Sequence, residues 1–161
     1  MSTLSMDPLT LGHTAITLVA IISGLMTLAA MMNNRNPKGA TALFLLFTLL
    51  TSVTGFVFFP ITKLTPALIL GGISLADMAV LLWAYFGARL AGGWRATYVV
   101  TATLALYFNV FVLVVQSFQK VPPLAGQPSI TGGPLFGAVQ GLVLLGFILA
   151  GWRAVKRFHP A

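Results

Sequence analysis

The chain has no cysteine and very few charged side chains. Without cysteine it can form neither a disulfide, nor a thiolate metal site, nor a cysteine nucleophile. Only 7% of its 161 residues are charged, whereas soluble domains carry about 25%. A surface this poor in charge would not stay in water, so the sequence predicts a protein whose solvent is lipid.

Acidic residues and histidines are also scarce, with two aspartates and two histidines in all. A zinc or di-iron site needs three or more ligands, and a membrane b-type haem usually needs two histidines on facing helices. Only His13 lies near a predicted span, because His159 follows the last one. No nucleotide-binding or nucleophile motif occurs. We therefore predict no metal, no cofactor and no catalytic residue, and an enzyme is the less favoured class.

What the chain does contain is long apolar runs: 58% of its residues are hydrophobic. A transmembrane helix needs about 20 such residues. Five stretches qualify, at about 11–32, 39–59, 66–90, 95–118 and 134–157. The first is too long for the apolar part of a signal peptide and has no basic residue before it, so we expect a retained span. The sequence predicts an all-α polytopic membrane helix bundle with a single domain over residues 1–161.

Basic residues gather on one side of this predicted bundle and give the chain a net charge of +7. Seven basic residues lie on this side: Arg35, Lys38, Arg89, Arg95, Arg153, Lys156 and Arg157. Only two, Lys63 and Lys120, would lie on the opposite side. Because cytoplasmic loops carry an excess of Lys and Arg, we expect the N-terminus outside and the C-terminus inside. We expect this face to contact anionic lipid rather than nucleic acid.

Asp77 is the one acidic residue inside a predicted span, in the run Leu64–Leu90. A carboxyl group at this depth is costly and usually has a partner or a function. Asn109 lies at the same depth on the next helix, and Gly92-Gly93 makes the two helices neighbours. We predict a hydrogen bond between Asp77 and Asn109. Asp77 is then either a structural neutral acid or, as we favour, a site for a proton, cation or small ligand.

Three further polar residues, His13, Gln116 and Gln140, fall in the outer third of their predicted spans. With the first, fourth and fifth helices adjacent, they would form a polar funnel above Asp77, and the basic side has no equivalent set. The sequence thus predicts a pocket that opens outward. The alternatives are that His13 is an interfacial residue and that Asn109 and the two glutamines only hold helices together.

The stretch Leu106–Pro122, LYFNVFVLVVQSFQKVP, together with the following proline-rich loop and the GAVQGLVLL helix, carries a resemblance. It is similar to a group of small, uncharacterised bacterial inner-membrane proteins. The resemblance covers the last two helices best. It implies a bacterial inner membrane but no activity, and it assigns no functional residue.

Three functional hypotheses follow from these observations. The favoured one is a transporter-like or sensing protein whose ligand-binding residues are Asp77 and the surrounding polar groups. The second is an accessory subunit of a larger membrane complex or a homo-oligomer, in which the polar residues serve packing alone. The third is a membrane enzyme that acts with a quinone or another lipid-linked molecule.

Overall fold

The computed structural model describes residues 7–58, 61–121, 124 and 133–161, and in these ranges it is all-α. Its long helices are α1 (Pro8–Met32), α2 (Lys38–Phe58), α3 (Pro66–Leu82), α4 (Trp94–Lys120) and α6 (Pro134–Arg157). A π-helical turn, η1 (Trp83–Gly87), continues α3. All five spans are long and apolar enough to cross a membrane. The predicted five-helix bundle is confirmed, whereas the direction in which it crosses stays a prediction.

Prolines mark the start of three helices, at Pro8, Pro66 and Pro134. Proline fits the first turn because the backbone N–H that it lacks has no partner there in any helix. At α3 the preceding residue adds a cap, because the Thr65 hydroxyl accepts a hydrogen bond from the Leu68 N–H at 3.2 Å. These signals place the helix starts within a few residues of the expected positions.

The connection between α3 and α4 is tight, as Gly92-Gly93 predicted. Gly92 has a φ of +54°, a left-handed conformation that glycine adopts without strain. Arg89 and Leu90 also have positive φ values, and the Leu90 N–H donates to the Ala84 carbonyl at 3.0 Å. The reversal therefore begins at the end of the π-helical turn, before the glycines.

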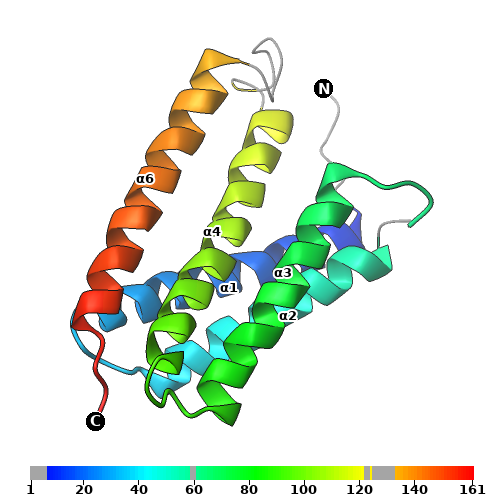
Figure 1. Cartoon of the computed structure of the whole chain (residues 1–161). Helices are drawn as coiled ribbons and strands as arrows, with labels where there is room; N and C mark the ends of the chain where they lie inside the picture. The colour runs from blue at the N-terminus through cyan, green and yellow to red at the C-terminus, as the bar shows by residue number, and fades with distance from the viewer. Residues whose placement is uncertain (1–6, 59–60, 122–123, 125–132) are drawn as a thin grey trace.

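The helices form two layers, one of α3, α4 and α6 and one of α1 and α2 (Figure 1). Helix α4 is central, because it contacts each of the other four. Helix α1 packs on α2, α4 and α6, and α4 packs on α6, so the first, fourth and fifth helices are neighbours, which the polar funnel would require. Helix α6 is the least buried of the five spans, because only 11% of its apolar segment is buried inside the protein.

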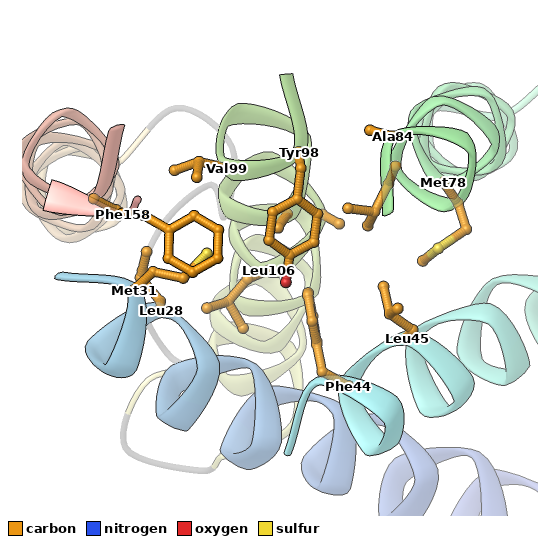
Figure 2. Packing of buried hydrophobic residues seen from close by; sticks show 14 residues of the cluster. Leu28, Met31, Phe44, Leu45, Met78, Ala84, Tyr98, Val99, Leu106 and Phe158 are labelled. Carbon is orange, nitrogen blue, oxygen red and sulfur yellow. The ribbon is translucent and has the colours of Figure 1, made fainter. Parts of the chain in front are cut away.

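The apolar core lies toward one end of the bundle. We call this the basic end: here α1 and α6 finish, α2 and α4 begin, and Arg35, Lys38, Arg95, Arg153 and Arg157 are found. Figure 2 shows Tyr98 of α4 pointing toward Phe44 of α2, with Phe158 seated against Met31 of α1. The rings of Tyr98 and Phe158 lie 5.8 Å apart, and neither side chain is exposed. The basic end is thus closed by packed aromatic residues.

Arg95 binds the end of α6 to this core. Its Nη1 donates to the carbonyl oxygens of Val155, at 2.9 Å, and of Phe158, at 2.6 Å. The last carbonyls of a helix have no partner within the helix, and a cation there also complements the helix dipole. The backbone N–H of His159 in turn donates to the Asn34 side chain at 2.8 Å. The end of α6 is therefore held by both α4 and the turn after α1.

Candidate functional site

Asp77 lies in the middle of α3, eleven residues after Pro66. At 1.5 Å per residue this places it about 16 Å along the helix. The side chain is half-buried, and its Oδ2 is a buried oxygen with no hydrogen-bond partner within the part of the chain that the structure describes. A buried acceptor without a partner usually costs about 1–3 kcal/mol, so this oxygen is the least satisfied feature of the helix.

The register of α3 against α4 sets the level of Asp77. The rings of Tyr85 and Tyr98 lie 5.1 Å apart and join the two antiparallel helices. Asp77 is eight residues before Tyr85, and Leu106 is eight residues after Tyr98. Asp77 and Leu106 are therefore at about the same depth, and Asn109 lies about 4.5 Å further along α4.

Asn109 makes a different contact from the predicted one. It is buried, and its Nδ2 donates to the Thr48 hydroxyl of α2 at 3.1 Å. Among the described residues no hydrogen bond joins it to Asp77, so the prediction of that bond was wrong. The main reason is rotational: Asn109 is about one helical turn from the level of Asp77, and its side chain turns toward α2 rather than α3.

A second polar contact lies one turn from Asp77. The hydroxyls of Ser74 on α3 and Ser52 on α2 are 3.3 Å apart and buried. Ser52 is one turn from Thr48 on α2, so the seam between α2, α3 and α4 carries the polar residues Thr48, Ser52, Ser74 and Asn109. All four are neutral. Asp77 thus lies beside a group of hydroxyl and amide groups, none of which is within hydrogen-bond distance of its buried oxygen.

His13 lies near the start of α1 and contacts α2. Its Nδ1 is 2.8 Å from the Thr54 hydroxyl of α2, and one turn deeper the hydroxyls of Thr17 and Thr51 are 3.4 Å apart. His13 is therefore at the end opposite the basic end, as predicted, in a polar contact that joins α1 to α2.

The two glutamines lie on α4 and α6. The Nε2 of Gln140 donates to the Phe111 carbonyl at 3.3 Å, while its Oε1 is buried without a partner among the described residues. The Oε1 of Gln116 is buried and unpartnered on the same terms. The structure therefore places His13 in the contact between α1 and α2, Gln140 in the contact between α4 and α6, and Gln116 on α4. No hydrogen bond within the described ranges joins them to Asp77.

The groove between α1, α4 and α6 does not contain the predicted site. It is lined by apolar residues, and none of His13, Asp77, Asn109, Gln116 and Gln140 is among them. The described residues also hold no group of three or more histidines and carboxylates that could bind a metal ion. The predicted polar pocket therefore stays a hypothesis based on Asp77 and the neutral seam beside it.

Sequence reasoning missed several residues that complete these contacts. Thr54 and Thr51 of α2, the partners of His13 and Thr17, were not among the residues predicted to form the polar site. A signal existed, since α2 carries five hydroxyl residues within fourteen positions. Arg95 was counted only as a charge that sets orientation, but it also binds the end of α6.

We compared the chain with models of protein families, with curated proteins and with solved structures, and none of them matches it.

Proposed function

We propose that Asp77 is an exchangeable site for a proton or small cation within a transporter-like or sensing membrane protein. The observation that carries this proposal is the buried Oδ2 of Asp77 without a hydrogen-bond partner among the described residues. A purely structural acid would use its oxygens to join helices, as the amide of Asn109 does. An oxygen left free inside a span is instead available to a proton or a cation, and ionisable groups at this depth commonly mark ion pathways.

The surroundings of Asp77 favour a small positively charged ligand. The seam beside it offers hydroxyl and amide groups, which are neutral oxygen ligands for a cation and links for a proton. It offers no positive side chain that would hold the carboxylate permanently in an ion pair. A bound proton or cation would neutralise the carboxylate charge, which lipid disfavours. Burial of Asp77 therefore favours binding of a proton or cation.

The route to the site follows from the asymmetry of the bundle. Polar contacts such as His13 with Thr54 lie toward the end opposite the basic end, whereas Tyr98 and Phe158 close the basic end. We propose that access is from the side of His13, Gln116 and Gln140, and that this side is extracytoplasmic. In this proposal the protein crosses a bacterial inner membrane with its N-terminus outside.

Infrared difference spectroscopy on the full chain in liposomes tests the protonation of Asp77. The chain has only two carboxylic side chains, Asp7 and Asp77, so the carbonyl band of a protonated acid can be assigned with two variants. We expect a band that changes with pH or added cation, disappears in Asp77→Asn and persists in Asp7→Asn. Asn keeps the size and polarity of the side chain, so the fold should survive.

Flux measurements complete the test. Liposomes with a pH-sensitive dye inside should show proton or cation movement with the wild type and with Asp7→Asn, and at least tenfold less with Asp77→Asn. A band that is unaffected by pH and cations, together with equal flux for the three proteins, would refute the proposal and leave Asp77 a structural acid.

A second candidate function, an accessory subunit, is favoured by the exposure of α6. Its Gly137 and Gly141 are exposed, and a Cβ on either would meet nothing within 4 Å. A pair of glycines four residues apart lets another helix approach closely. If this function is correct, the purified chain will associate in mild detergent, and Gly137→Leu will weaken the association. A stable monomer would count against it.

A further inference from the structure

A groove of about 680 Å³ runs between α1, α4 and α6. Its walls are formed by Ile21, Leu25 and Ala29 of α1 and by Leu142, Gly146 and Ala150 of α6. Residues of α4 form its floor. Its polar content is negligible, and Leu142 at its rim is 71% exposed. The groove therefore suits a flexible hydrocarbon and offers no polar group to hold a polar ligand.

Along α1, the groove is about as long as one leaflet of a bilayer is thick. On α1 its lining runs from Ile21 to Met32, the last residue of the helix at the basic end. These eleven steps span about 16 Å, and half of a hydrocarbon core of about 30 Å is about 15 Å. Along α1, an acyl chain that starts at the basic end would therefore reach about the middle of the bilayer.

Two arginines continue the groove face of α6 at the basic end. Arg153 and Arg157 follow Gly146 by seven and eleven residues, so they share its face of the helix. Both are exposed. Lys156 lies on another face, where its Nζ is 4.4 Å from the centre of the Trp152 ring.

The charge of these arginines is not neutralised by the chain. The only acidic side chains in the sequence are Asp7, which precedes α1 at the opposite end, and Asp77, in the middle of α3. An anionic group at the basic end of the groove would therefore meet two free guanidinium groups, which bind phosphate well.

We infer that this groove binds one acyl chain of an anionic phospholipid, with the lipid phosphate at Arg153 and Arg157. The hydrophobic lining, and its length along α1, match the acyl chain of such a lipid. The two arginines at one end, which face no acidic side chain, match its phosphate. The site is separate from Asp77, so it stands whether or not the proposed function is correct.

Native mass spectrometry of the full chain in detergent, titrated with phosphatidylglycerol or phosphatidylcholine, tests the acyl-chain part. Gly146→Leu fills the groove, and a Cβ at Gly146 meets nothing within 4 Å, so the fold should tolerate it. Gly72→Leu is the matched control, because Gly72 is equally open but lies on α3, away from the groove. We expect Gly146→Leu to retain at least fivefold less phosphatidylglycerol than Gly72→Leu, and the wild type to match the control.

The arginines are tested with a second pair of variants. A basic residue at an anionic lipid surface contributes about 1 kcal/mol, or roughly fivefold in affinity. We expect Arg153→Gln with Arg157→Gln to lower the preference for phosphatidylglycerol over phosphatidylcholine by about 25-fold, and Lys156→Gln to lower it by less than twofold. Asp77→Asn should leave lipid binding unchanged. Glycerol phosphate without acyl chains should not compete, because the site requires the hydrocarbon.

Three results would overturn the inference. If Gly146→Leu retains as much phosphatidylglycerol as Gly72→Leu, the groove does not hold the acyl chain. If Lys156→Gln lowers the preference for phosphatidylglycerol by about fivefold, the effect expected for one basic residue at the lipid surface, the lipid responds to general charge at the basic end, and no defined site exists. Competition by glycerol phosphate would identify a phosphate site in place of a lipid site.

Discussion

Replacing Gly24 tests the closest helix contact in the bundle. Gly24 of α1 is buried where α1 meets α2 and α4. A Cβ built on it would lie 2.6 Å from Leu106 Cδ1 and 2.8 Å from Phe44 Cδ2. Both neighbours are 1% exposed, so neither can swing away without disturbing the core around Tyr98.

The size of the effect follows from two opposing contributions. Overpacking a well-packed core costs typically 1–3 kcal/mol. Alanine is more favourable than glycine within a helix by roughly 0.5–1 kcal/mol. For Gly24→Ala we therefore expect the free energy of unfolding to fall by about 1 kcal/mol, and by at most about 2.5 kcal/mol. Gly12→Ala is the matched control: Gly12 lies on the same helix with nothing within 4 Å of a Cβ, so this change should be neutral or slightly stabilising.

Reversible unfolding in mixed micelles, followed by circular dichroism, measures both variants against the wild type. The lower stability of Gly24→Ala should come with an intact helix content, because the change affects packing between helices. Equal unfolding free energies for Gly24→Ala and Gly12→Ala would show that α1 does not approach α2 and α4 this closely, and the reasoning about the core would be refuted.

Two further predictions concern the polar contacts between helices. Arg95→Met should lower the free energy of unfolding by about 2–4 kcal/mol, because two carbonyls at the end of α6 lose their donor and hydrogen bonds to charged groups contribute about 1.5–3 kcal/mol. Limited proteolysis should then cleave the chain after Val155 faster in Arg95→Met than in the control variant Lys156→Met. A double-mutant cycle of Asn109→Leu with Thr48→Val should give a coupling energy of only about 0.6 kcal/mol, the average for hydrogen bonds inside membranes. A coupling energy near zero would mean that the hydrogen bond between Asn109 and Thr48, 3.1 Å long, is not formed in lipid.

The five helices were predictable from hydropathy because lipid leaves the backbone little choice. Every backbone N–H and C=O group inside the bilayer needs an internal partner, and a helix provides it. Pro66 and Pro134 stand at the predicted starts of their helices, whereas α1 begins at Pro8, three residues before the predicted start. The π-helical turn at Trp83–Gly87 was not predictable, since no single residue there requires it.

The candidate site was harder to predict because depth and direction are separate quantities. Counting residues placed Asp77 and Asn109 at similar depths, and the Tyr85–Tyr98 contact supports that register. The side of α4 on which Asn109 meets a partner depends on how α2 is tilted and rotated, and hydropathy does not specify this. Asn109 therefore donates to Thr48 in the structure and not, as predicted, to Asp77.

Phe158 has a consequence for how the bundle is assembled in a cell. It follows α6, yet it fills a place between Tyr98 and Met31 with no exposed surface. Because it comes after the last span, it can dock only when all the membrane segments have left the ribosome. Closure of the basic end is therefore the last step in assembling the bundle.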